Sequence, residues 1–303
     1  MSAGTSIRRT EGRSKLEQDG TLAKGESWGM KLSYVEPRSE LQPYIEALWI
    51  FESPIGFPAM DASIAAPNGC CKLTFVLDNS ITAVANGRAA TDQPQRLYFT
   101  GIRDSATLLR SSSDKTGCIG IEFRPHGAFP VFGIPMGDVS GSHWQADDLL
   151  GKWATNTQEI LNNLQSVTEK VDFLQDQLVG LLQRNGRVSD LATYCVQTLK
   201  AADGRLSIQD LAQATGYSRR YLSMLFKQHV GVPPKVLAGI FRFQRFYKNW
   251  AKANSFDLLK DELYEYYYDQ SHFTKEFKKM TGYSPRELAG GIVNEFGRRH
   301  SLR

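Results

Sequence analysis

Basic and polar side chains gather in residues 218–230, a segment that begins at Ser218 and is followed by Gly231. Arginine and lysine side chains can read guanine edges or hold phosphates in the major groove of DNA. At helical spacing, one face of the segment carries Ser218, Arg219, Arg220, Ser223, Met224 and Lys227. This face predicts binding to duplex DNA, with Arg220 as the expected base contact.

Two short helices joined by a tight turn must position these side chains. Ser207 and Asp210 predict a helix start, because their side chains can satisfy free amide hydrogens, and the helix would span residues 208–214. Gly216 permits the turn, and Ser218 caps a second helix that ends at Gly231. Its inward stripe is expected to contain Tyr221, Leu222, Leu225, Phe226 and Val230. We interpret the pair as a helix-turn-helix, with a helical hairpin bearing a solvated basic face as the alternative.

A second unit repeats this organisation in residues 269–281. Asp269 would cap its helix, Phe273 and Phe277 would point inward, and Gly282 would end it. The outward side chains, which we expect to contact DNA, are Gln270, Ser271, Thr274, Lys275 and Lys278. A periodic helix over residues 236–253 would link the units and place two reading helices in successive major grooves, about 34 Å apart.

The two units carry the patterns GYSRRYLSMLFK and YDQSHFTKEFKKMTGYSP. Together these patterns resemble the AraC/XylS family of bacterial transcription regulators over residues 206–288. The resemblance implies sequence-specific binding to double-stranded promoter DNA by two helix-turn-helix subdomains, with RNA polymerase as a further partner. It also implies base or backbone contacts from the outward residues of both units.

The second unit departs from the family pattern at residues 261–270, where Tyr266 occupies the glycine position of the turn and Glu262 that of a small buried residue. Tyrosine adopts a positive φ at a higher energetic cost than glycine does. A one-residue deletion that turns Leu263 inward is an alternative alignment. The alternative function is therefore a non-DNA-binding helical interaction module with a degenerate second unit.

Residues 31–143 predict a β-rich domain, since about seven short segments alternate apolar and polar residues between turns. The sequence segments 67–77 and 120–135 resemble the cupin-like sensor domain of some AraC-type regulators. The expected fold class is α+β, with an N-terminal β-barrel or sandwich and an all-α C-terminal domain of two helix-turn-helix subdomains. If the β-rich domain holds a small-molecule effector, its wall is expected to contain Trp49, Phe51, Phe75, Tyr98, Phe123, Arg124 and His126.

The remaining segments complete the expected domain organisation. Residues 1–30 read as a disordered leader and residues 291–303 as a flexible tail, because both lack an apolar period. Residues 144–202 form a helical connector whose apolar stripe would pack on the barrel or pair with a second subunit; packing is favoured. The DNA-binding domain then spans residues 203–290.

Composition bounds the function. Residues 187–303 hold 19 Lys and Arg against 11 Asp and Glu, a balance of +8, so the rest carries −4 of the total +4. A basic C-terminal part fits a polyanionic partner. No His, Cys or carboxylate cluster has metal-ligand spacing, so we expect no metal, no cofactor, no catalytic residue and no enzymatic activity. The sequence has no secretory signal or long apolar span, which predicts a cytoplasmic protein without membrane contact. Because two reading helices in one chain allow a monomer to bind DNA, both a monomer and a homodimer remain open.

Overall fold

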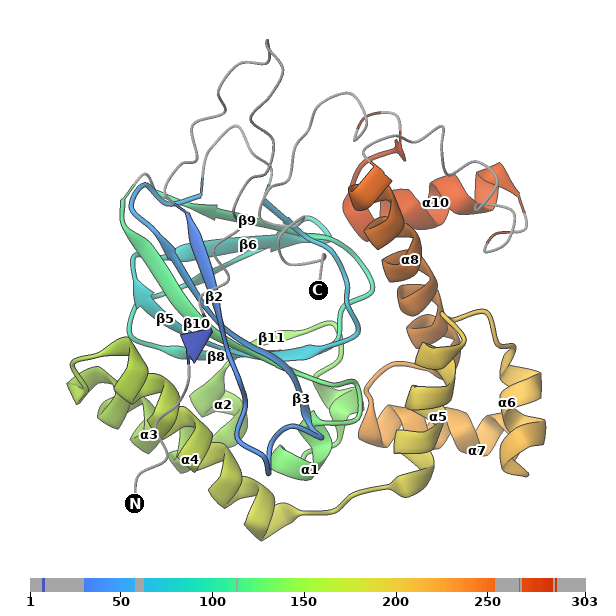
Figure 1. The fold of residues 1–303 in the computed structure, drawn as a ribbon, viewed down its shortest axis with the longest axis horizontal. Helices are drawn as coiled ribbons and strands as arrows, with labels where there is room; N and C mark the ends of the chain where they lie inside the picture. The colour runs from blue at the N-terminus through green and yellow to red at the C-terminus, as the bar shows by residue number, and fades with distance from the viewer. Residues whose placement is uncertain are drawn as a thin grey trace.

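The computed structural model describes residues 7–8, 30–57, 63–112, 114–253, 267, 269–285 and 287. A β-rich part, flanked by helices, comes first in the chain, and a helical part packs beside it (Figure 1). The predicted α+β class is confirmed. The strands are β1 (Ile7–Arg8), β2 (Lys31–Val35), β3 (Ile45–Ser53), β4 (Ser63–Ala65), β5 (Cys71–Asp78), β6 (Ile81–Ala85), β7 (Arg88–Asp92), β8 (Leu97–Thr100), β9 (Thr107–Ser111), β10 (Thr116–Phe123) and β11 (His143–Gln145).

The strands form two antiparallel sheets. The larger has the order β1-β2-β3-β10-β5-β8-β11 and the smaller has the order β4-β9-β6-β7. The alternating segments that predicted the β-rich domain form β2, β3, β5, β6, β8, β9 and β10, whereas β1, β4, β7 and β11 were not predicted. Of the leader predicted to be disordered, Ile7–Arg8 instead pairs with β2, whose open edge offers unpaired backbone groups. The rest of that prediction lies outside the described residues.

The larger sheet is apolar on both faces, because each face is covered. Along β5, Leu73 and Phe75 join a hydrophobic cluster that also contains residues of the surrounding helices. Trp49 and Tyr98 belong to a second cluster with Phe51 and Phe57, on the side that faces the smaller sheet. Successive side chains along these strands therefore point alternately to the face covered by helices and to the face that is turned toward the smaller sheet.

Helices cover the outer face of the larger sheet. They are α1 (Ala128–Phe132), α2 (Ala146–Leu150), α3 (Lys152–Asn163) and α4 (Val167–Asn185), with a 3-10 turn η1 (Met136–Asp138). The ring of Phe132 meets Phe99 and Phe123 edge-on at 5.3 and 5.2 Å between centroids. Helix α4 starts at a capping box of Ser166 and Glu169 and buries Val171, Leu174 and Leu178 of its apolar stripe within this chain. The structure thus confirms packing for that stripe.

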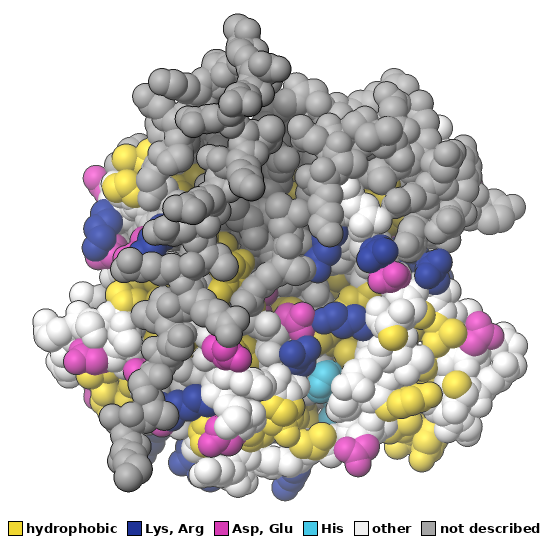
Figure 2. Space-filling model, in the orientation of Figure 1, with side chains coloured by type: hydrophobic (Ala, Val, Ile, Leu, Met, Phe, Trp, Pro, Cys, Tyr) yellow, Lys and Arg dark blue, Asp and Glu magenta, His cyan; other side chains and the backbone are white. Residues whose placement is uncertain are grey.

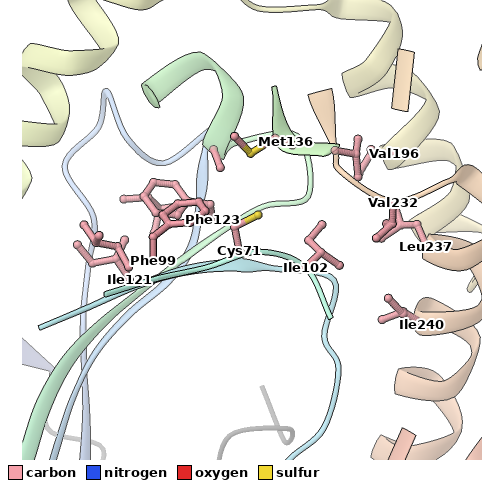
Figure 3. Close-up of a cluster of buried hydrophobic side chains, with 14 of the residues drawn as sticks. Cys71, Phe99, Ile102, Ile121, Phe123, Met136, Val196, Val232, Leu237 and Ile240 are labelled. Atoms are coloured by element: carbon pink, nitrogen blue, oxygen red, sulfur yellow. The ribbon is translucent and has the colours of Figure 1, made fainter. Parts of the chain in front are cut away.

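The C-terminal helices are α5 (Asp190–Ala201), α6 (Ile208–Thr215), α7 (Arg219–His229), α8 (Pro234–Ala253) and α10 (Gln270–Thr281). The hydrophobic core runs without interruption from the larger sheet to these helices (Figure 3). Figure 3 places Ile102 and Met136 of the β-rich part beside Val196, Val232 and Leu237 of the helical part. The two parts therefore share one core rather than meeting across a polar linker.

Among the described helices, none is both long and apolar enough to cross a membrane. The four cysteines are buried and unpaired, and burial raises the pKa of Cys71 and of Cys118 to about 12. A thiol with so high a pKa carries almost no thiolate at neutral pH, which makes it a poor nucleophile.

Candidate nucleic-acid interface and ligand pocket

Helices α6 and α7 form the predicted first helix-turn-helix. The side chain of Ser207 accepts a hydrogen bond from the Asp210 amide at 3.0 Å, and Ser218 accepts one from the Tyr221 amide at 3.2 Å. Gly216 ends α6 at φ 72°, in the left-handed region that glycine tolerates best. Helices α6 and α7 start within one residue of the predicted positions, since these caps are local signals.

The inner side of α7 is narrower than predicted. Leu222, Phe226 and Val230 are buried, whereas Tyr221 is 42% exposed and Met224 is 59% exposed. The ring of Tyr217 stacks on that of Tyr221 at 4.8 Å between centroids. The inward placement of Tyr221 was therefore wrong: its ring packs on the exposed Tyr217 rather than in the core.

The outward side chains of α7 are available to a partner. Every predicted DNA-contacting residue of the first unit is exposed. Ser223 donates to the Arg219 carbonyl at 2.9 Å, so its hydroxyl proton is already used. Near the other end of α7, the ring of His229 packs on Phe129 at 4.3 Å, and burial lowers the pKa of His229. The N-terminal half of α7 thus projects, while its C-terminal end is anchored to the β-rich part.

Helix α10 is the predicted reading helix of the second unit. Asp269 caps it by accepting from the His272 amide at 2.7 Å, and Gly282 ends it. The predicted contact residues are exposed apart from Thr274, which is partly buried and donates to the Gln270 carbonyl at 2.8 Å. Tyr266 and the first helix expected for this unit lie outside the described residues.

Helix α8 carries both units. One guanidinium nitrogen of Arg242 lies 3.0 Å from each carboxylate oxygen of Glu276, and Phe246 meets Phe273 at 4.8 Å between centroids. Both members of this ion pair are largely buried, so it fixes the orientation of α10 on α8. At 1.5 Å per residue the 20 residues of α8 span about 30 Å, close to one turn of DNA. Figure 1 shows α7 and α10 at opposite ends of α8.

The charged groups are distributed unevenly over the visible face. On that face, Lys and Arg side chains gather along the junction between the β-rich part and α8, whereas hydrophobic and uncharged side chains dominate over α6 and α7 (Figure 2).

A pocket lies between the two sheets. The larger sheet contributes Trp49, Thr74, Thr100, Cys118 and His143, and the smaller sheet contributes Ala65, Ile81, Ala83, Asp92, Thr107 and Leu109. The cavity holds about 120 Å³. Nε2 of His143 lies 2.6 Å from Asp92, and Nδ1 lies 2.8 Å from the Thr100 hydroxyl. This polar trio sits in a mostly apolar wall, as small-molecule sites commonly do.

The predicted effector wall is divided by the structure. Trp49 lines the pocket, and Phe51 and Tyr98 pack in the same enclosed cluster. Phe75 and Phe123 instead lie in the core on the helix-covered face of the sheet, so their assignment to the wall was wrong. The alternation of residues along a strand shows which side chains share a face of the sheet. Because both faces of this sheet are apolar, it does not show which face lines the pocket.

Arg124 and His126 were also misplaced, because the chain leaves the sheet at the end of β10. They line a second pocket of about 250 Å³ between the β-rich part and α5. There Glu46 lies 2.9 Å from both Arg124 and Lys200. Burial, followed by the positive charge of Arg124, lowers the pKa of His126.

Sequence reasoning missed the polar residues of the first pocket, namely Asp92, Thr100, Arg103 and His143. They come from separate strands and loops, and no local motif joins them. The one usable signal is the polar residue at the end of a short alternating segment, Asp92 in RAATD. Within the described residues, no three His, Cys, Asp or Glu side chains cluster as a metal site would require.

Two family models match the chain. A domain of unknown function, DUF6597, matches residues 33–145, and a helix-turn-helix domain matches residues 211–290. The match at residues 211–290 is to a helix-turn-helix domain of the AraC type. The AraC-type resemblance predicted from the two GYS-containing segments is thereby confirmed.

Several known proteins are similar to this chain. The F1 operon positive regulatory protein of Yersinia pestis is 33% identical over 100 residues, which cover 33% of this chain and 32% of that protein. A candidate HTH-type transcriptional regulator of Escherichia coli (strain K12), YkgA, is 36% identical over 84 residues, which cover 27% of this chain and 34% of that protein. Each alignment spans about a third of the length of these curated relatives.

Among solved structures, ToxT from Vibrio cholerae is similar over 81% of this chain and 98% of its own, with 13% identity and a TM-score of 0.44. A second ToxT structure, with a bound unsaturated fatty acid, matches over 84% of this chain and 96% of its own, with 12% identity and a TM-score of 0.42.

Proposed function

We propose that this protein is a transcription regulator that binds promoter DNA through α7 and α10 and senses a small molecule in its β-rich part. The observation that carries the proposal is the pair of capped, outward-facing helices held about one DNA turn apart by α8. Phosphate contacts from lysines and arginines would supply most of the affinity, and a few α7 and α10 side chains would read bases.

The sensing role is supported by two loops that line the first pocket and also touch the AraC-type domain. In the first loop, Gly101 and Arg103 face the pocket, while Asp104 lies 2.6 Å from Lys279 of α10. In the second loop, Pro67 lines the pocket and its carbonyl accepts a hydrogen bond from Gln244 of α8. A ligand that moves either loop would therefore act on the helices that carry the DNA contacts.

The proposal extends to partners. Such a regulator would act in the cytoplasm, where promoter DNA lies, and it would contact RNA polymerase there. Because one chain holds two reading helices, a monomer suffices for DNA binding, and a homodimer would occupy two adjacent sites. The proposal assigns the chain no catalytic activity.

The experiment that tests the proposal is selection of bound duplexes from a random pool by the full chain, followed by a salt titration on the winning sequence. We expect two conserved blocks about one helical turn apart and an affinity that falls steeply with salt. A single block would assign sequence reading to α7 and only backbone contacts to α10. If no sequence is enriched at any salt concentration, the helical units act as a protein-interaction module instead.

A further inference from the structure

The cavity between the two sheets is small and mostly apolar. Its volume of about 120 Å³ is near that of an engineered cavity of about 150 Å³ that takes up benzene. Its apolar wall includes Trp49, Ile81 and Leu109, which come from both sheets. The space between the sheets therefore holds a ligand body of about six to eight non-hydrogen atoms, and that body is apolar.

Most charged side chains at the cavity already have partners. The ammonium group of Lys72 lies 2.8 Å from Glu122, which is 3% exposed and also accepts from Asn68 at 2.9 Å. Asp92 is 7% exposed and is held by His143. Lys72 and Asp92 therefore each have a partner within the protein.

Arg103 is different. Its Nη1 donates to the Thr107 hydroxyl at 2.9 Å, but its buried Nε has no acceptor. Within the described part of the chain, no carboxylate lies within ion-pair distance of this guanidinium. Burial lowers the pKa of Arg103, with a smaller opposing effect from the negative charge of Asp92. Arg103 is half-buried, and leaving its buried Nε donor unused is costly; an anionic oxygen that reaches the guanidinium would reduce that cost.

We propose that this cavity binds a compact monocarboxylate, with the carboxylate on the Arg103 guanidinium and a branched or cyclic apolar body against Trp49, Ile81 and Leu109. A guanidinium presents planar, forked donors that match the two oxygens of a carboxylate. A phosphate fits less well, because a doubly charged, strongly hydrated group would face one unpaired cation in an apolar wall. The assignment names the class of ligand for the proposed sensing function, and the biological role of the ligand rests on that function. Binding of the carboxylate can be tested without it.

Calorimetric titration of the full chain tests this assignment with a matched pair of probes. The carboxylate 3-methylbutanoate and its neutral isostere 3-methylbutanamide share shape and size but differ in charge. We expect the carboxylate to bind with a Kd of about 1 mM or below, as a ligand of about seven non-hydrogen atoms allows, and the amide to bind at least about tenfold more weakly. Equal binding of the two probes, or no binding of the carboxylate at 10-fold that concentration (about 10 mM), would overturn the proposal.

Substitution locates the site. We expect Arg103→Gln to weaken 3-methylbutanoate binding at least about tenfold, because it removes the charged hydrogen bond. The control is Arg110→Gln, which removes the same charge from an exposed position on β9 and should leave binding unchanged. Undiminished binding by a folded Arg103→Gln protein refutes the assignment. If Arg103→Gln fails to fold, Arg103→Lys, which retains the charge but loses the planar fork, should show the same direction of effect.

Chain length and DNA binding supply two independent readouts. Dodecanoate is too large for about 120 Å³, so tighter binding with increasing chain length would contradict a compact ligand. If the protein binds the carboxylate but selects no DNA sequence, the regulator proposal is refuted and the ligand assignment is retained. If it binds DNA sequence-specifically but does not bind the carboxylate, the ligand assignment is refuted and the regulator proposal is retained.

Discussion

The carboxylate of Asp104, in the loop after β8, lies 2.6 Å from the ammonium group of Lys279 on α10. The same loop donates a backbone hydrogen bond from Ala106 to the Lys279 carbonyl at 3.3 Å. One loop of the β-rich part therefore holds both the side chain and the backbone of a single residue near the end of α10.

This ion pair should contribute little to stability, because its side chains are 39% and 52% exposed. We expect Asp104→Asn and Lys279→Gln to change the free energy of unfolding by less than about 1 kcal/mol each, with a coupling energy of similar size. Urea unfolding of both single variants and the double variant, at low and high salt, measures that coupling. A coupling above about 2 kcal/mol that persists at high salt would instead mean that water is excluded from the pair.

Arg220 is the position where we expect the largest effect on sequence preference. Arg220→Ala should relax the preference at one guanine and cost about 1–3 kcal/mol of discrimination there, because it removes a bidentate base contact. The loss of discrimination is measured from the affinities of the wild-type and variant proteins for a panel of DNA sites that differ by single bases. The matched control is Arg187→Ala, an exposed arginine outside the reading helices. If Arg220→Ala weakens all sequences equally, Arg220 contacts a phosphate.

Lys275 on α10 is expected to act through charge. Lys275→Gln should weaken binding to all sequences by a similar factor and reduce the slope of log K against log salt by about 1. A salt titration of the wild-type protein, this variant and Lys152→Gln on α3, an exposed lysine far from the reading helices, provides the comparison. A changed sequence preference with an unchanged slope would make Lys275 a base-reading residue.

Two glycines with positive φ provide a matched test of the contact between α7 and the β-rich part. A Cβ on Gly231 would lie 2.7 Å from the Met136 carbonyl oxygen, whereas one on Gly216 would meet nothing within 4 Å. We expect Gly216→Ala to cost about 1–2 kcal/mol from its backbone conformation alone. Gly231→Ala should cost clearly more, because the Met136 backbone must also shift. If urea unfolding gives equal losses of unfolding free energy for the two variants, the contact between α7 and η1 can rearrange at little energetic cost.

Acidification should weaken the junction between the two parts. Burial lowers the pKa of His229 and, together with the Arg124 charge, that of His126, so both folded-state values lie below the unfolded value of about 6.5. Each histidine therefore stabilises the fold above about pH 6.5, and that stability is lost as the pH falls through the folded pKa. Urea unfolding at several pH values measures the loss.

Substitution separates these histidines from other titrating groups. His126→Gln should flatten the decline in stability below about pH 6.5, whereas replacement of the exposed His272 by glutamine should leave the decline unchanged. A decline of the same steepness in the His126 and His229 variants would assign it to carboxylates instead.

The helix-turn-helix elements could be predicted closely because their signals are local. The caps Ser207, Ser218 and Asp269 and the terminating Gly216 and Gly282 each act within one turn of chain, and all are found where expected. The exposure of Tyr221 was not predicted, because its spacing fits the inward stripe while its ring stacks on the exposed Tyr217.

The pocket could not be predicted to the same extent. Every residue of β10 is buried, so its sequence does not reveal which face is enclosed and which is covered by helices. The residues that give the pocket its polarity, Asp92, Arg103 and His143, come from three separate segments. Only the pairing of β7 with β6 and of β11 with β8 brings these segments together.

The 20-residue helix α8 also limits how this chain can change in length. Leu237 and Phe241, near its start, pack against the loop at Gly69, while Arg242 and Phe246 hold α10. A single inserted residue between these groups would turn one set by about 100° relative to the other. Neither the shared core nor the ion pair with Glu276 would survive such a rotation. Insertions should therefore be excluded from α8 while remaining acceptable at the open Asn86-Gly87 hairpin. The length of α8 would then be the constant feature that sets the distance between α7 and α10.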